Sequence, residues 1–170
     1  GAGLINDVAA LRERGALEAA AALGVPVILM HMQGDPGTMQ QAPHYDDVVS
    51  EVVAFLEERV AACLGAGIPQ ERLLVDPGFG FGKSAVHNLA LLRGLPALER
   101  LGLPVAAGLS RKSLVGDITG APVEQRLGGS IALALLAAER GARLLRVHDV
   151  TATVQALAIL DAVGGGTTDA

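Results

Sequence analysis

The sequence predicts an α/β fold in which five βα units form a parallel sheet with helices packed on it. Short apolar runs recur along the chain, and a longer segment of helical period follows each of them. The residues are 51% hydrophobic but only 2% aromatic, which suits helices on a sheet of small apolar side chains. Because no linker divides the chain, we expect one domain over residues 1–163 and a disordered tail over residues 164–170.

The predicted strands are short, and all but the first are continuous apolar runs. Parallel strands that are buried on both faces have this pattern. The five runs are Gly3 to Ile5, Val25 to His31, Leu73 to Asp76, Val105 to Leu109 and Leu144 to Val147.

The segments between the strands predict helices. The clearest is Asp46 to Leu64, in which apolar residues recur every three or four positions. The Ala- and Leu-rich segment Val123 to Arg140 is expected to bury more than one face, which makes it the candidate helix for a homodimer interface. The other predicted helices are Gly15 to Leu23, Asn88 to Leu101 and Thr151 to Val163, the last of which follows a cap at Asp149 or Thr151.

Charge and cysteine content argue against several classes of protein. The net charge is -5 and no Lys/Arg-rich run occurs, so nucleic acid is not an expected partner. The single cysteine, Cys63, permits no intrachain disulfide and fits a reducing cytoplasm. No apolar run has the length of a membrane span, and the start GAGLINDV lacks the pattern of a signal peptide. We expect a soluble cytoplasmic protein with no membrane partner.

The motif VDPGFGFGK places polar groups after the third predicted strand, where parallel barrels build their sites. Asp76 follows a buried strand, and the glycines after it let the backbone pass close to a ligand. A buried carboxylate can accept two parallel N–H bonds from a guanidine-like heterocycle edge, such as that of a pterin. Alternatively, Asp76 caps the following helix. Lys83 either closes the Gly-rich loop or is solvated.

The motif GLSRKS follows the fourth predicted strand. Ser110 is expected to N-cap a short helix whose free N–H groups attract an anion. Arg111 and Lys112 add two cations at the same place. The alternative interpretation is that these two charges are solvated on a loop.

The motif RVHDV ends the fifth predicted strand. Alternation predicts that Arg146 and His148 point to the same side, where a guanidinium and an imidazole would suit a pyrophosphate. The alternative is a structural ion pair between Arg146 and Asp149 beside a hydrogen-bonded histidine.

Three further residues are weaker candidates. Asn6 can hydrogen-bond a heterocycle edge or serve as a turn residue, and Met30 can pack on a flat ring or belong to the core. His31 is expected to be buried and hydrogen-bonded. The sequence has no His/Cys/Asp spacing typical of zinc, no GxSxG motif and no CxxC motif.

Taken in order, INDV, LMHMQGDPGTMQ, DPGFGFGK, GLSRKS and RVHDV resemble the dihydropteroate synthase family over nearly all of residues 1–160. The resemblance implies a TIM (β/α)₈ barrel of the pterin-binding type, of which this chain would supply strands 4 to 8. It implies the condensation of 6-hydroxymethyl-7,8-dihydropterin pyrophosphate with p-aminobenzoate to dihydropteroate and pyrophosphate. It also implies inhibition by sulfonamides and a homodimer.

The resemblance assigns roles to individual residues. It places the pterin against Asn6, Met30, Asp76 and Lys112, and the pyrophosphate at Arg146 and His148 with the help of Mg²⁺. It makes Lys112, Arg146 and His148 the catalytic residues. The residues implied around p-aminobenzoate are Phe81, Gly108, Ser110, Arg111 and Lys112. The Asn that the family links to magnesium lies in an N-terminal loop absent from this sequence, so no metal ligand is expected here.

The length of the chain bears on its activity. Its 170 residues fall short of the roughly 250 that a complete barrel needs. Five of eight strands cannot close a barrel and are expected to leave two long edges and an exposed core. We therefore expect the chain alone to be inactive unless another chain supplies the rest. The alternatives are a related pterin-binding corrinoid methyltransferase and a half-barrel without catalytic activity.

Overall fold

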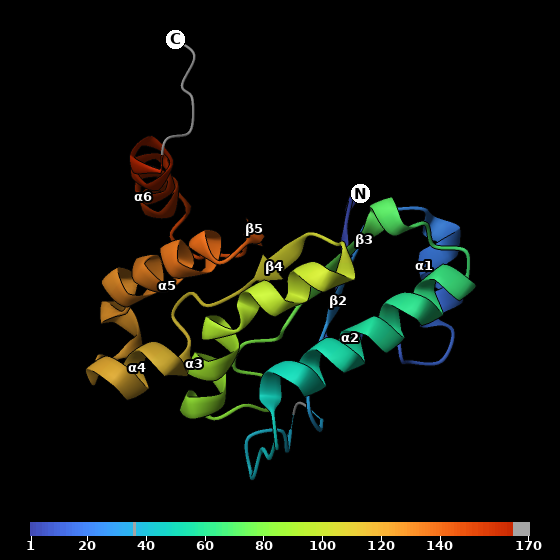
Figure 1. Ribbon diagram of the computed structural model, residues 1–170, viewed down its shortest axis with the longest axis horizontal. Helices are drawn as coiled ribbons and strands as arrows, with labels where there is room; N and C mark the ends of the chain where they lie inside the picture. Colours follow the sequence, from blue (N-terminus) through green and yellow to red (C-terminus); the bar gives the residue numbers. More distant parts are fainter. Residues whose placement is uncertain (36, 165–170) are drawn as a thin grey trace.

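The computed structural model describes residues 1–35 and 37–164. Its centre is a parallel sheet whose five strands lie side by side in sequence order (Figure 1). The strands are β1 (Ile5–Asp7), β2 (Val27–Met30), β3 (Leu73–Asp76), β4 (Val105–Ala107) and β5 (Ala142–Leu145). Since β1 and β5 form the two outer edges, the sheet is open, and the predicted α/β partial barrel is confirmed. The predicted tail, apart from Gly164, lies outside the described residues.

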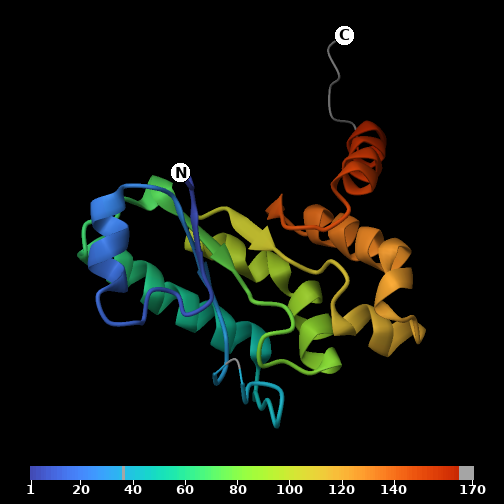
Figure 2. The same cartoon turned by 180° about the vertical axis from the view of Figure 1, so that it is seen from behind.

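The helices alternate with the strands. Figure 2, seen from behind Figure 1, shows the strands in front of α2 and α3, which cover one face of the sheet. The helices are α1 (Ala16–Leu23), α2 (Val48–Gly65), α3 (Ala85–Arg93), α4 (Ser113–Thr119), α5 (Leu127–Glu139) and α6 (Val150–Val163). Three 3₁₀ segments lie in the connections between these elements: η1 (Gln70–Arg72) before β3, η2 (Leu95–Leu101) before β4, and η3 (Val123–Gln125) between α4 and α5.

Two of the predicted helices were wrong in extent, because each is divided into an α-helix and a 3₁₀ segment. The segment from Asn88 to Leu101 is divided at Gly94, where α3 ends and η2 begins. Gly94 allows close packing there, because a Cβ at this position would lie 2.7 Å from Val49 Cγ2 of α2. The segment from Val123 to Arg140 is likewise divided, at Arg126, between η3 and α5.

The first and last strands are displaced from their predicted positions. β1 lies two residues later than predicted because Ile5 pairs with Val27 and its N–H donates to Pro26 O at 2.9 Å. β5 lies two residues earlier because the buried Ala142 pairs with Val105. Arg146 and His148 consequently follow the strand. The prediction that they point to the same side assumed that both belong to the strand, and this premise was wrong.

The two faces of the sheet have different surroundings. Strand register puts Asn6, Ile28, Met30, Leu74, Asp76 and Ala106 on the face opposite the main helix-packed core. An exposed barrel core was predicted, but Ile28, Met30 and Ala106 are each at most 4% exposed. They lie on β2 and β4, each of which has a neighbouring strand on both sides, whereas Leu74 on the same face is only half-buried.

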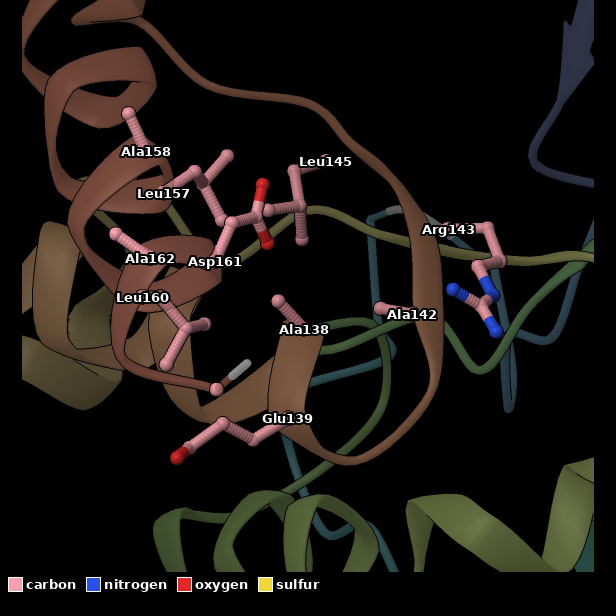
Figure 3. A pocket seen from close by; sticks show the side chains of 11 residues that line it. Ala138, Glu139, Ala142, Arg143, Leu145, Leu157, Ala158, Leu160, Asp161 and Ala162 are labelled. Atoms are coloured by element: carbon pink, nitrogen blue, oxygen red, sulfur yellow. The ribbon is translucent and has the colours of Figure 1, made fainter. Parts of the chain in front are cut away.

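Helix α6 lies at one end of the molecule, next to α5 (Figure 1). Thr153 is its only buried residue, whereas Val154, Ile159 and Val163 are 58%, 67% and 81% exposed. A groove of about 1050 Å³ separates α6 from α5 and β5, with Leu157 and Ala138 among its lining residues (Figure 3). α6 therefore presents an apolar surface that the described residues leave largely uncovered.

A matched pair of leucines on α2 tests the position of the core. Leu56 is fully buried and Leu64 is 44% exposed. We expect Leu56→Ala to lower the free energy of unfolding by about 2–5 kcal/mol because it leaves a cavity. Leu64→Ala should change it by no more than about 0.5 kcal/mol. Urea unfolding monitored by circular dichroism measures both, and equal losses would contradict the assigned burial.

Candidate active site

The carboxylate of Asp76 lies at the carboxyl end of β3 and is 5% exposed. Its Oδ1 accepts the N–H of Gly78 at 2.7 Å, the one hydrogen bond to this carboxylate within the described part of the chain. Burial raises the pKa of Asp76, while this hydrogen bond and three cations oppose the rise. The cations are Lys112, Arg146 and Lys83. The cap of α3 is Ser84, so the alternative interpretation of Asp76 as a helix cap was wrong.

Lys112 reaches from the loop after β4 to the turn after β3. Its Nζ donates to Phe79 O and lies 4.6 Å from the centre of the Phe81 ring. Burial lowers the pKa of Lys112 to about 8; Arg146 adds to the decrease and Asp76 opposes it. The structure therefore brings together Lys112, Phe81 and Asp76, which the sequence analysis had placed in one site.

Arg146 approaches the same place from the loop after β5. Its backbone N–H donates to Ala107 O at 3.0 Å, which continues the pairing of β4 and β5 by one residue. Its guanidinium lies over Gly108, because a Cβ at Gly108 would be 3.0 Å from Nη2. The absence of a side chain at Gly108 thus leaves room for the Arg146 guanidinium at the end of the sheet.

Ser110 and His148 join the loops after β4 and β5. Ser110 Oγ accepts the His148 N–H at 3.2 Å and lies 3.0 Å from His148 Nδ1. The prediction that Ser110 caps a helix was wrong, because α4 begins at Ser113 and its N-cap is Lys112. Ser110 is held instead by the neighbouring loop.

Arg111 forms an ion pair with Asp149. Arg111 Nη2 and Nε donate to the two carboxylate oxygens at 2.6 and 3.0 Å. The hydrogen bonds to Arg111 lower the pKa of Asp149, and those to Asp149 raise the pKa of Arg111. The alternative interpretation of RVHDV, an ion pair between Arg146 and Asp149, was wrong in the choice of arginine.

Lys83 is 3% exposed and lies beneath the turn after β3. Its Nζ donates to Gly78 O and Phe81 O at 3.0 Å each and lies 2.9 Å from His31 Nδ1. Burial lowers the pKa of Lys83 to about 7, Lys112 acts in the same direction, and Asp76 opposes both. Of the two interpretations of Lys83, loop closure is confirmed, and so is the burial of His31.

Asn6 and Met30 are on the same face of the sheet as Asp76. Met30 is the register partner of Asp76, and a Cβ at Gly78 would lie 3.3 Å from Met30 Cγ. Asn6 is exposed on the outer strand β1, and the structure shows no contact that joins it to Asp76 within the described residues. Met30 therefore belongs to the assembled site, while Asn6 lies at its open side.

The sequence analysis missed two contributions to this site. One is the role of Asp149 as the partner of Arg111, since the sequence offered Asp149 only as a helix cap or as a partner of Arg146. The other is the Phe79 carbonyl, a backbone group that no sequence motif marks.

Within residues 1–35 and 37–164, no group of three or more His, Cys, Asp and Glu side chains is placed to hold a metal ion.

Comparison with known proteins identifies the class. The pterin binding enzyme family matches residues 1–148, and the chain belongs to this family. The dihydropteroate synthase of Escherichia coli K12 is 52% identical over 162 residues, which are 95% of this chain and 57% of that protein. The chain thus spans less than two thirds of the length of such relatives.

Solved structures extend the comparison. The Xanthomonas albilineans dihydropteroate synthase with 4-aminobenzoic acid matches 98% of this chain and 59% of its own, with TM-score 0.91 and 60% identity. The Yersinia pestis dihydropteroate synthase in a sulfonamide drug complex matches 98% of this chain and 61% of its own, with TM-score 0.95 and 49% identity. No helix among the described residues is long and apolar enough to cross a bilayer.

The buried His31 makes stability depend on pH. Burial, aided by Lys83, lowers the pKa of His31 from 6.5 to about 3, so an unfolded chain binds a proton that the folded chain rejects. The stabilisation is complete above pH 6.5 and is lost as pH falls from 6.5 toward 3. We expect a loss of about 1 kcal/mol per pH unit from this group. Urea unfolding between about pH 6.5 and 4.5 should show a shallower dependence in His31→Gln, and an unchanged slope would contradict this prediction.

Proposed function

We propose that this chain contributes the substrate-binding end of a dihydropteroate synthase, which joins dihydropterin pyrophosphate to p-aminobenzoate. The observation that carries the proposal is a buried carboxylate, Asp76, surrounded by cations that arrive from different loops. A site of this kind suits a neutral heterocycle with an amidine-like edge and a polyanionic leaving group. The 4-aminobenzoic acid named with the Xanthomonas albilineans synthase supports the second of these substrates.

The pterin is proposed to lie against Asp76, with Met30 beneath it. Asp76 has one internal hydrogen bond among the described residues, so it retains capacity to accept donors from the amino-pyrimidinone edge of a pterin. Met30 is an adaptable apolar side chain on the same face. Asn6, on the outer strand β1, is proposed as a further pterin contact once another segment packs over the open side of the sheet.

The p-aminobenzoate is proposed to lie between the turn after β3 and the loop after β4. Phe81 offers a flat apolar surface, and Lys112 offers a cation within 4.6 Å of the centre of that ring. The guanidinium of Arg111 is engaged by Asp149, so we propose that it fixes this loop and that Ser110 and Lys112 supply the polar contacts.

The pyrophosphate is proposed to leave toward Arg146 and His148. The aromatic amine forms a C–N bond to the pterin methylene carbon as the C–O bond breaks, its electron pair stays on the pyrophosphate, and the amine proton is released to solvent. No base is required of the protein, since catalysis rests on positioning and on stabilisation of the developing negative charge. Arg146 and Lys112 are the cations nearest to that charge.

We propose that the Mg²⁺ implied by the family is bound outside the described residues. The described residues offer no cluster of acidic or imidazole ligands, so they do not fit a resident metal ion. Within this chain, the residues proposed to stabilise the developing negative charge are therefore Arg146, His148 and Lys112.

We propose that the five βα units correspond to strands 4 to 8 of a complete barrel. The unpaired edges of β1 and β5 and the uncovered apolar surface of α6, as the described residues show them, support this assignment. We also propose a homodimer through the region of α5, where Leu127 and Leu136 are exposed. A cytoplasmic site is proposed because the buried Cys63 is a free thiol.

A corrinoid methyltransferase remains the alternative enzyme. The anion-binding pair of Arg146 and His148 favours pyrophosphate chemistry over methyl transfer. Sulfonamide competition discriminates between the two, because a methyltransferase should respond neither to p-aminobenzoate nor to a sulfonamide.

We expect the 170-residue chain alone to form no dihydropteroate, since an open sheet cannot complete the site. A chimera that adds the part of the Escherichia coli synthase outside the match should be active. The assay measures dihydropteroate from dihydropterin pyrophosphate and p-aminobenzoate. Activity of the isolated chain would refute the expectation that an open sheet is inactive, and an inactive but folded chimera would refute the proposed function.

In that chimera, Asp76→Asn should reduce kcat/KM by about 100-fold, because it replaces one carboxylate oxygen with an NH₂ donor and so cannot accept two parallel N–H bonds from the pterin edge. The matched control is Asp46→Asn, an exposed acid before α2, which should retain activity. Steady-state kinetics measures both. Similar activities for the two variants would remove Asp76 from the pterin site.

A further inference from the structure

Lys83 and Lys112 are the only two lysines in the sequence, and their ammonium groups reach the same Gly-rich turn. Lys112 is already part of the proposed substrate site. Lys83 is not, although it is more deeply buried. Its contacts therefore serve some purpose other than binding of the two substrates.

The ammonium of Lys83 has no capacity left for a ligand. An ammonium has three hydrogens, and three partners lie within 3.0 Å: Gly78 O, Phe81 O and His31 Nδ1, which accepts in the tautomer protonated at Nε2. The side chain is 3% exposed, so water does not replace any of them. Lys83 therefore acts on the protein itself.

These acceptors hold one turn against the end of β2. Phe81 N–H donates to Gly78 O at 3.1 Å, so Lys83 bonds both ends of a single tight turn. A Cβ at Gly78 would lie 1.9 Å from His31 O, and a Cβ at Gly82 would lie 2.4 Å from Gln33 O. The backbone of the turn consequently packs against the backbone of residues 31–33. Lys83 holds it in this position through the contact of its Nζ with the His31 side chain.

The same turn presents groups to the site. Phe79 O accepts from Lys112, the Phe81 ring faces Lys112, and the Gly78 N–H donates to Asp76. A displacement of the turn would change all three contacts at once. Displacements of about 1 Å are enough to lower catalytic rates substantially.

We propose that Lys83 is a positioning residue that sets the turn over β3 and thereby orients Phe81 and Lys112 toward the aminobenzoate. The consequence for catalysis rests on the proposed function. The orientation of the turn does not, and it can be measured without a ligand.

The lysine count makes a direct measurement possible. Lysine labelled with ¹³C at Cε gives two side-chain signals in the 170-residue chain, and Lys83→Met leaves the signal of Lys112 alone. The Phe81 ring shifts the Lys112 Hε protons by its ring current, and Phe81→Leu defines their position without that ring. We expect Lys83→Met to move the Lys112 signal most of the way toward its position in Phe81→Leu.

The control separates positioning from stability. Ile68→Val removes one methylene from a residue that is 2% exposed and precedes β3, so it weakens the fold away from the turn. It should leave the Lys112 signal unchanged. A folded Lys83→Met chain with an unchanged Lys112 signal would overturn the proposal. If Lys83→Met does not fold, His31→Leu removes one of the three acceptors and must shift the signal in the same direction, or the proposal fails.

The kinetic consequence is tested in the chimera. Lys83→Met should reduce kcat/KM for p-aminobenzoate by about 10- to 100-fold, and Ile68→Val should not reduce it. A shifted Lys112 signal with unchanged kinetics would overturn the catalytic consequence. An inactive wild-type chimera would instead refute the proposed function and leave the signal measurement to decide the position of the turn.

Discussion

A carboxylate that is 5% exposed has lost most of the water that would stabilise its charge, and Asp76 is such a group. Its compensation comes from a backbone N–H within its own turn and from cations on three different loops. The burial that raises the pKa of Asp76 also lowers the pKa values of Lys83 and Lys112. Asp76 opposes the decrease in the pKa of each lysine, and both lysines oppose the rise in the pKa of Asp76, so the loops that carry these groups depend on one another.

The Gly-rich turn after β3 links these loops through direct contacts. It has almost no freedom to move, because Gly78 and Gly82 touch the backbone that follows β2. Lys83 secures it from below, and Lys112 contacts it from the loop after β4. The loop after β5 joins through the pair of Arg111 and Asp149 and through Ser110 and His148. Three successive βα units thus share one rigid end.

The rest of the molecule is less complete. Within the described part of the chain, β1 and β5 each have an unpaired edge, and α6 is anchored near its beginning while its apolar side chains face outward. Membership in the pterin binding enzyme family, with relatives considerably longer than this chain, gives these surfaces a common explanation. Under the proposed assignment to strands 4 to 8, these are the surfaces against which further βα units of a barrel would pack. Asp76 and Lys112 lie at the ends of the inner strands β3 and β4, whereas Arg146 and His148 follow the edge strand β5.

The sequence by itself determined the α/β class, the number of βα units, the range of β3 and the family, because buried parallel strands and strand-end motifs are local patterns. It also indicated Asp76, Lys112 and Arg146 as neighbours, since the carboxyl ends of parallel strands meet. Only the tertiary structure decided which charges pair. Arg111 rather than Arg146 binds Asp149, Ser110 bonds His148 rather than capping a helix, and Lys83 closes the turn. Such choices depend on distances between loops that are far apart in the chain, which no local pattern encodes.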